Sequence, residues 1–354
     1  MPIRDRYIQQ RFDDTGNPED PYTTSLQNLP KDVNGIEGGI ERLWMYPFKA
    51  LGGLRKGSVR LTQQGFADIK GMYRDRMVML AHGDLDSGES LKRFSQREEP
   101  KLALIEASMS PSETLHYHIP GRDAFPMPLE QSMPNEKRRR TNVVVAGDMI
   151  ETEVEGDGPI TRAIRDYLGS FRDDADRIHV LFPAAGSPRV VEDRHRCGID
   201  GAETLLSDGG QILLESWPSW DFIQKSRQNS VRPIPINVTR PNIAVIGWPA
   251  HLEDVLASAS IRPERDRSRE QMRMLFGGLC VRCKVTQVDL EHGVHAKDGE
   301  PFKTFQSARP RRLDLNDGKP DKRPTFGVNV VAEKNAWGRI ISIGDPIVAL
   351  EEKE

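Results

Sequence analysis

Short runs that alternate apolar and polar residues fill the chain from Ile40 onward, and they constrain its fold more than any other feature. The first of them are GIERLWMYPF, GSVRLTQQGF and RDRMVML, which glycine-containing turns separate. The last third of the chain alternates again in RPNIAVIG, PTFGVNVVAEK and GRIISIGDPIVAL. A period of two is typical of strands that bury one face. The sequence therefore predicts a β-barrel or a β-sandwich.

A smaller α/β unit is predicted in the middle of the chain. The strand pair TNVVVAGDMIETEVEG leads into GPITRAIRDYLGSF, where Ile160, Ile164 and Leu168 recur at helical spacing, and DRIHVLFPA then supplies a buried strand. The preceding residues 107–142 are rich in proline and polar residues, so we expect an insertion loop there. Residues 252–276 are charged and are expected to form one helix or a long loop.

The N-terminal residues 1–37 are polar and rich in turn-forming residues, which favours an extension lying over a folded body that begins near Ile40. They contain no apolar run of the kind found in signal peptides, and no part of the chain has the apolar length of a membrane span. Three cysteines are too few for a disulfide framework. We therefore expect a cytoplasmic protein without a transmembrane anchor.

The overall charge is almost balanced, because the chain has 50 Lys and Arg residues and 53 Asp and Glu residues. Such a chain has no global basic field that would attract nucleic acid or an anionic membrane. Nucleic acid is not expected as a partner, and any basic site must be local.

Two cysteines stand close together in CVRC, as Cys280 and Cys283. With His292 and His295 they could bind zinc, although the spacing is shorter than in zinc fingers. A redox pair should open a helix, whereas the β-branched KVTQV that follows predicts a strand. Cys280 could equally be a small apolar filler. Cys283 lies beside Arg282, which could stabilise a thiolate, and a lone thiolate suits a soft metal.

The order of the motifs resembles that of MOSC-domain proteins of the amidoxime-reducing component type. The matching segments include YPFKALGG, SQREEPKLALI, DGGQILLES, TRPNIAVIG, CVRCKVTQVD and GRIISIGDPIVAL, and they extend from about Ile40 to Leu350. The resemblance implies a β-rich α+β fold, in which a MOSC β-barrel packs against an N-terminal β-barrel-like domain with a cofactor between them. It divides the chain into an extension (1–37), an N-terminal domain with the α/β appendage (38–235) and a MOSC domain (236–354).

The same resemblance implies a molybdenum cofactor, in which a pterin dithiolene and one protein cysteine hold the metal. The cysteine at the matching position is Cys283, and Cys280 matches a loop position that is not a ligand. The matching cofactor contacts are Lys49, Arg76, Arg240, Asn242 and Arg282. Cationic donors suit phosphate and pterin oxygens, and an asparagine amide can both donate and accept.

This chain departs from the family pattern at several positions. Ala50 replaces the serine that commonly follows the YPxK lysine, which removes one hydroxyl contact. The segment LESWPS leaves open whether Ser216 or Ser219 takes the family's serine position, and the bulky Trp217 there is expected to reshape the pocket. Arg97 could reach the site, but we expect it to brace the barrel.

In function, the resemblance implies an oxidoreductase that reduces amidoximes, hydroxylamines and N-hydroxylated bases. The chain has too few cysteines for an iron–sulfur cluster of its own, so the electrons are expected from a cytochrome b5 or flavin reductase partner. The alternative is a carrier of molybdenum cofactor or sulfur, because MOSC domains also occur in cofactor maturation. Pyridoxal phosphate binding is a further expectation that comes with the family.

Overall fold

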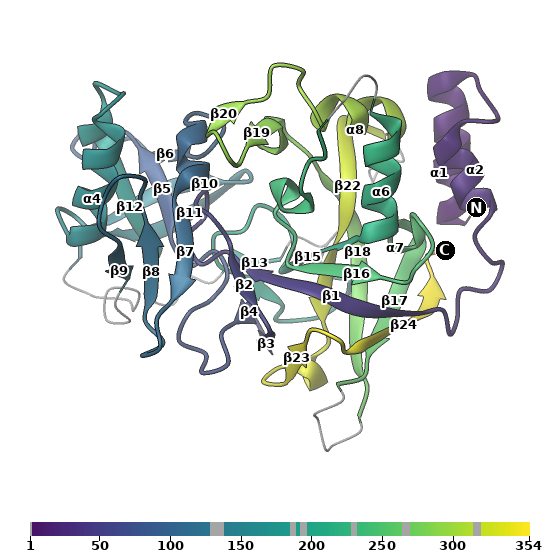
Figure 1. Cartoon of the computed structure of the whole chain (residues 1–354). Helices are drawn as coiled ribbons and strands as arrows, with labels where there is room; N and C mark the ends of the chain where they lie inside the picture. Colours follow the sequence, from purple (N-terminus) through teal and green to yellow (C-terminus); the bar gives the residue numbers. More distant parts are fainter. Residues whose placement is uncertain are drawn as a thin grey trace.

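A closed barrel of seven strands forms the larger part of this computed structural model (Figure 1). Around the barrel the strands are β15 (Ile212–Ser216), β16 (Ile243–Ile246), β1 (Glu37–Met45), β24 (Pro346–Glu352), β17 (Leu256–Ile261), β18 (Met272–Val281) and β22 (Pro320–Ala332). Pairing of β22 with β15 closes it. The structure describes residues 2–127, 138–184, 189–191, 197–227, 232–263, 270–313 and 320–354. The predicted β-rich fold class is confirmed.

The barrel combines strands from distant parts of the chain. β1 and β15 precede residue 236, yet they lie in one barrel with the strands that follow it. β15 and β16 run parallel, and β1 pairs antiparallel with both β16 and β24. The division of the chain at residue 236 stays a prediction.

Alternation along β18 shows how the barrel core is built. Met274 and Phe276 are buried, whereas Leu275 between them is only half-buried. The pairing with β22 then shifts register between Phe276 and Leu279, across two glycines. An irregularity of this kind bends a strand and re-aims the residues beyond it. The end of the strand, including Cys280, reaches the cavity described below.

A second body lies beside the barrel (Figure 1). Its antiparallel sheet contains, in order, β10 (Arg140–Val145), β11 (Asp148–Val154), β12 (Ile178–Pro183), β5 (Met79–His82) and β6 (Lys92–Phe94). Helix α4 (Pro159–Leu168) packs its buried Ile160 and Ile164 into the same apolar cluster as Val180 of β12. The predicted α/β unit is confirmed. The strands β3 (Ser58–Thr62), β4 (Gly65–Ala67) and β23 (Ile340–Ser342) form a third sheet.

The insertion loop predicted over residues 107–142 is wrong in part. An antiparallel sheet of β7 (Glu106–Met109), β8 (Leu115–His118) and β9 (Phe125–Met127) occupies its first half. Leu115, Tyr117 and Met127 are fully buried in the core of the second body, so this segment is part of the fold. Residues 128–137 lie outside the described part of the chain.

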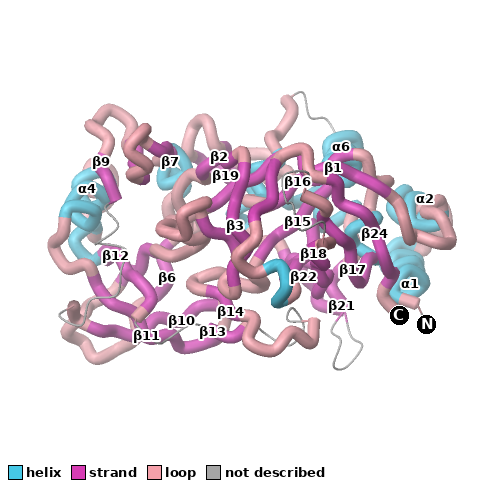
Figure 2. The backbone as a smooth tube through the Cα atoms, turned by 90° about the horizontal axis from the view of Figure 1, so that it is seen from below, coloured by secondary structure: helices cyan, strands magenta, loops and turns pink. Residues whose placement is uncertain are grey.

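Two further predictions need correction. Structure begins at Ile3 rather than near Ile40, because α1 (Ile3–Thr15) and α2 (Pro21–Gln27) pack Tyr7 and Leu26 into the barrel core. Figure 2 shows both helices at the end of the molecule that holds the two termini. Residues 252–276 are also not one helix or loop. They form the short α7 (Leu252–Val255), β17 and the start of β18, with residues 264–269 outside the description.

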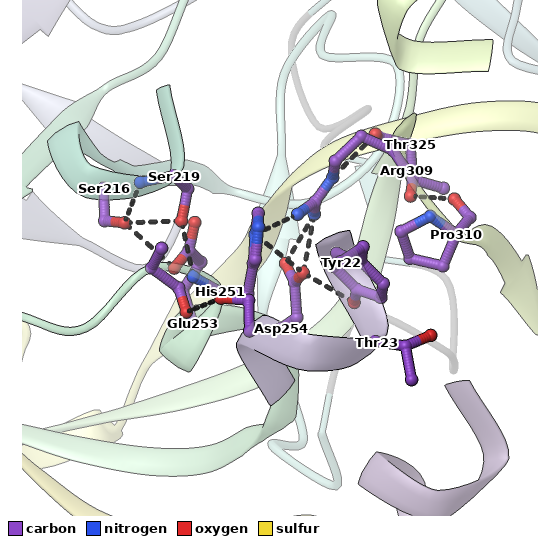
Figure 3. Close-up of polar contacts among 12 residues, drawn as sticks. Tyr22, Thr23, Ser216, Ser219, His251, Glu253, Asp254, Arg309, Pro310 and Thr325 are labelled. Carbon is purple, nitrogen blue, oxygen red and sulfur yellow. Dashed lines mark hydrogen bonds and ion pairs between the residues drawn. The ribbon is translucent and has the colours of Figure 1, made fainter. Parts of the chain in front are cut away.

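A buried polar network joins α2 to the barrel (Figure 3). Its members are Tyr22, Ser216, Ser219, His251, Glu253, Asp254 and Arg309. The Asp254 carboxylate accepts from the Tyr22 hydroxyl at 2.9 Å and from Arg309 Nη2 at 2.8 Å. The Ser216 hydroxyl caps α6 (Trp217–Ser226) by accepting from Ser219 N, and it donates to Glu253 at 3.0 Å. Buried polar groups are tolerated when they are bonded in this way.

Glu253 makes the stability of the protein depend on pH. Burial, helped by the charge of Asp254, raises the pKa of Glu253 from 4.5 to about 7. Between these values the folded protein holds a proton that the unfolded chain releases, so the free energy of unfolding falls as the pH rises from 4.5 to 7. We expect Glu253→Gln to reduce this fall, as measured by urea unfolding at pH 5 and pH 7.5. The exposed Glu19→Gln is the control, and an unchanged slope in the Glu253 variant would contradict the assignment.

Candidate functional site

A cavity of about 170 Å³ lies where the barrel meets the second body. All six residues predicted to hold the cofactor line it: Lys49, Arg76, Arg240, Asn242, Arg282 and Cys283. They come from the segment after β1, the segment before β5, the segment just before β16 and the turn after β18. The fold therefore brings together residues that lie far apart in the sequence.

Cys283 stands at the turn that follows β18. Its carbonyl accepts from Thr286 N at 3.1 Å and from the Thr286 hydroxyl at 3.0 Å, which fixes the one-turn helix η4 (Lys284–Gln287). The strand predicted for KVTQV is therefore wrong over most of its length. The half-buried Cys283 thiol points its sulfur at Arg97, whose Nη2 lies 3.1 Å away. Arg97 reaches the site, and the expectation that it only braces the barrel is wrong.

Arg282, the neighbour of Cys283 in sequence, turns its guanidinium elsewhere. It donates to the carbonyls of Phe326 and Thr239, both at 2.8 Å, and it forms a buried ion pair with Glu215. Gly327 makes room for this pair, because a Cβ there would lie 2.7 Å from Cγ of Glu215. The cation next to the sulfur is therefore Arg97, not Arg282 as the sequence suggested.

A second group of cations surrounds Asp208, in DGGQILLES. Lys49 Nζ donates to the Leu206 carbonyl at 2.5 Å and to the Asp208 carboxylate at 2.9 Å, and Arg93 pairs with the same carboxylate. Burial lowers the pKa of Lys49 to about 8. Arg93 was missed by the sequence reading, because nothing in its local pattern distinguishes it from a surface cation.

A third group lies just before β16. Arg240 donates to the Leu51 carbonyl at 2.6 Å and stacks its guanidinium 4.3 Å above the Tyr46 ring. Burial lowers the pKa of Arg240 to about 10. Its buried Nη2 has no hydrogen-bond partner among the described residues. A buried donor without a partner is costly, so this atom indicates a missing acceptor.

Arg76 and Asn242 hold each other in place. Arg76 pairs with Asp75 and donates to the Asn242 amide oxygen at 3.0 Å. That oxygen also accepts from Leu213 N at 3.0 Å, and the amide nitrogen donates to the Trp44 carbonyl at 3.2 Å. The Asn242 side chain thus braces the cavity wall, and its predicted contact with the pterin ring stays a prediction.

The backbone is strained at three positions of this cavity. Ala50, Arg76 and Arg240 have φ values of 82°, 52° and 60°, in the left-handed region that side chains other than glycine seldom adopt. Each such residue costs on the order of 1 kcal/mol or more, and such residues concentrate at functional sites. All three line the cavity.

The cations and the thiol that line the cavity suit an anionic ligand that also needs one thiolate. Lys49, Arg76, Arg93, Arg97, Arg240 and Arg282 all line the cavity, and Asp208 is the carboxylate among the lining residues. Arg240, whose buried Nη2 has no hydrogen-bond partner among the described residues, and Cys283 both line this space. Phosphate or oxo groups bind well to such cations, and a soft, high-valent metal suits the sulfur.

The zinc alternative is not supported by the geometry. His292 Nδ1 lies 3.0 Å from Asp289, and His295 Nε2 contacts the Arg97 carbonyl, so neither joins the cysteines. Among the described residues, the group with metal-ligand spacing is Asp289, Glu291 and His292, and it is largely exposed. Cys280 lies at the end of β18 rather than in a loop, and burial raises the pKa of its thiol.

Arg97 should control the reactivity of Cys283. In the cofactor-free protein we expect iodoacetamide to modify Cys283 first, because burial raises the pKa of both Cys197 and Cys280. Arg97→Met should slow the modification by about threefold or more, because it removes the guanidinium that lies 3.1 Å from the sulfur. Mass spectrometry of the labelled peptides measures this rate. Arg93→Met is the matched control, since Arg93 pairs with Asp208. Equal rates in the two variants would contradict the role of Arg97.

Comparison with known proteins identifies both parts of the chain. Residues 37–172 match the MOSC N-terminal beta barrel domain, and residues 202–348 match the MOSC domain. The mitochondrial amidoxime reducing component 2 of Rattus norvegicus is 24% identical over 315 residues, which is 88% of this chain and 82% of that protein. Its counterpart in Homo sapiens is also 24% identical, over 88% of this chain and 83% of its own length.

A third relative is named as a sulfurase rather than as an amidoxime reducing component. The molybdenum cofactor sulfurase of Danio rerio is 23% identical over 93% of this chain, which spans only 36% of that longer protein. None of these comparisons supports the expectations of pyridoxal phosphate binding or of a cytoplasmic location. Within the described ranges, every helix is too short or too polar to cross a membrane.

Proposed function

This chain belongs to the MOSC family, and on that basis we propose that it is a molybdenum-cofactor-dependent reductase of N-hydroxylated compounds. The observation that carries the proposal is the Cys283 thiol, held 3.1 Å from Arg97 in a cavity lined by cations. Relatives named for amidoxime reduction, although only 24% identical, support the choice of substrate. Amidoximes, hydroxylamines and N-hydroxylated bases are the proposed substrates.

Different residues of the cavity would have different roles in this reaction. Cys283 would bind the metal, and Lys49, Arg76, Arg240 and Arg282 would neutralise the oxygens of the cofactor. The bound cofactor would supply the two-electron chemistry. Over a full cycle, two electrons and two protons break the N–O bond and release the oxygen as water. Lys49, with a pKa of about 8, can hold or give up a proton near neutral pH.

The electrons are proposed to come from a separate cytochrome b5 or flavin reductase. Expression in a host that makes the cofactor, followed by metal analysis and reduction of benzamidoxime with a chemical electron donor, tests the function. We expect about one molybdenum per chain and formation of benzamidine. A protein that is fully loaded with molybdenum but does not reduce benzamidoxime or hydroxylamine would overturn the proposal.

A carrier of molybdenum cofactor or sulfur is the second candidate. The match to a molybdenum cofactor sulfurase over 93% of this chain favours it. A carrier should transfer its cofactor to an apo-enzyme, such as cofactor-free nitrate reductase, within minutes of mixing. A reductase should keep it, because its cofactor must survive many turnovers. Molybdenum analysis of the two proteins after separation distinguishes these outcomes.

A further inference from the structure

A surface groove of about 930 Å³ lies on the second body, between β6 and β10. The Leu91 N–H donates to the Asn142 carbonyl at 2.9 Å, which holds the start of β6 beside β10. The groove is open to solvent, because most of its lining residues are exposed. These include Glu89, Lys92, Arg97, Glu98 and Val144. A partner as large as another protein can therefore approach it.

The groove adjoins the cavity around Cys283. Arg93 and Arg97 line both spaces. Arg97 is exposed on the groove side, and its Nη2 lies 3.1 Å from the Cys283 sulfur. A molecule that contacts Arg97 from the groove is therefore separated from the proposed metal ligand by this one side chain. Electrons tunnel through packed side chains, so their transfer needs no open passage between the two spaces.

The charges along the groove favour an acidic partner. Its lining contains four Lys and Arg side chains and two carboxylates: Lys92, Arg93, Arg97, Arg172, Glu89 and Glu98. Arg93 and Arg172 pair with Asp208 and Asp174. The carboxylate of Glu98 is turned back to Ser95, whose N–H and hydroxyl donate to it at 2.9 and 2.8 Å. The groove is thus a local basic site on a chain whose overall charge is almost balanced.

Exposed apolar side chains lie beside these cations. Val144 lines the groove and is 43% exposed, because its neighbours Val143 and Val145 take the buried face of β10. Met149, which pairs with Val144 across β10 and β11, is 67% exposed. An apolar spot with a charged rim is typical of protein–protein interfaces, and transient electron-transfer complexes use small ones.

We propose that this groove docks an acidic one-electron donor protein, which delivers its electrons from the Arg97 side of Cys283. The inference rests on the proposed function, because that reaction needs an external electron donor. Two donor molecules, each oxidised by one electron, supply the two electrons that break one N–O bond. Solvent supplies the two protons with which the oxygen leaves as water. Carboxylates around the redox centre of the donor would meet Lys92 and Arg97, which orients that centre towards the site and speeds the encounter.

Carbodiimide cross-linking tests the docking face without any turnover, because it joins a lysine directly to a carboxylate that contacts it. The acidic probes are the soluble domain of cytochrome b5 and a flavodoxin, each mixed with the cofactor-free protein. We expect Lys92 to be linked to at least one of them, as identified by mass spectrometry of the joined peptides, and the yield to fall about threefold or more in about 0.5 M salt.

Two controls accompany the cross-linking. Lys31 is exposed but belongs to a different part of the molecule, and cytochrome c is a basic haem protein. The inference predicts few links to Lys31 and few links between Lys92 and cytochrome c. If neither acidic probe is linked to Lys92, or if Lys31 and Lys92 are linked equally, the groove is not the docking face.

Charge reversal tests the same face during turnover. Lys92→Glu and Val144→Glu should each raise the KM for the reduced acidic donor about fivefold or more. Chemically pre-reduced protein bypasses docking, so in a single turnover both variants should convert benzamidoxime within about twofold of the wild-type rate. Lys31→Glu is the matched control and should change neither value. A wild-type KM in Lys92→Glu and Val144→Glu would overturn the inference. If pre-reduced wild-type protein loaded with molybdenum converts neither benzamidoxime nor hydroxylamine, the proposed function fails, and the cross-links still decide the docking face.

Discussion

Cys283→Ser should purify with at least about tenfold less molybdenum than the wild-type protein when both are expressed in a host that makes the cofactor. A serine hydroxyl is a harder and less acidic ligand than a thiol, and Arg97, placed to favour a thiolate, would face a neutral group instead. Inductively coupled plasma mass spectrometry gives the metal content, and reductase activity should fall with it. Two protein sulfurs line the cavity, from Cys280 and Cys283, and among the described contacts only the Cys283 sulfur lies within hydrogen-bond distance of a guanidinium group.

Cys280→Ser is the matched control for this experiment. Cys280 lines the same cavity three residues earlier, but its sulfur contacts only the Val281 carbonyl, at 3.8 Å, among the described contacts. We expect this variant to keep its molybdenum and most of its activity. If instead Cys283→Ser keeps its full complement of metal, the ligand assignment is wrong. If Cys280→Ser loses as much metal as Cys283→Ser, both sulfurs belong to the metal site.

The contrast between Arg97 and Arg282 shows where sequence reasoning failed and why. Adjacent residues of an extended chain point in opposite directions, so the neighbour of Cys283 in sequence is poorly placed to touch its sulfur. Arg282 accordingly turns to Glu215, and Arg97 approaches from 186 residues away in the chain. The motif SQREEP marked Arg97 as a candidate, but only the packing of the second body on the barrel decides which way its guanidinium points.

The fold was more predictable than the site, because strands carry their own signal. The short apolar runs that became β16 and β24 identified these strands, although each strand buries three consecutive residues rather than one face alone. The helix α1 has no comparable signal. It buries Gln10 and Arg11 beside Tyr7. Arg11 pairs with Asp20 and donates to the carbonyls of Ser307 and Arg309. Those partners are visible only in the folded molecule, so the segment looked like a polar extension.

The buried pair of Arg282 and Glu215 should dominate the stability of the site. Arg282 is 6% exposed, Glu215 is 0% exposed, and the arginine also holds two carbonyls of the barrel. Arg282→Met leaves the Glu215 charge buried without compensation, so we expect the free energy of unfolding to fall by about 3–5 kcal/mol. Urea unfolding at pH 8 measures this loss. Arg273→Met, which breaks a half-exposed pair with Glu351, should cost less than about 1 kcal/mol.

A second substitution shows whether the uncompensated charge causes the loss. In Arg282→Met/Glu215→Gln no buried charge remains, so the double variant should recover about half or more of the stability lost in Arg282→Met. Lowering the pH should also recover part of the stability that Arg282→Met loses. Burial raises the pKa of Glu215 to about 7 even beside Arg282, so the carboxyl of the single variant is protonated at pH 5 and its deficit should shrink there. A deficit that is equal at pH 5 and pH 8, and equal in the single and double variants, would mean that Arg282 stabilises the barrel through its carbonyl bonds rather than through Glu215.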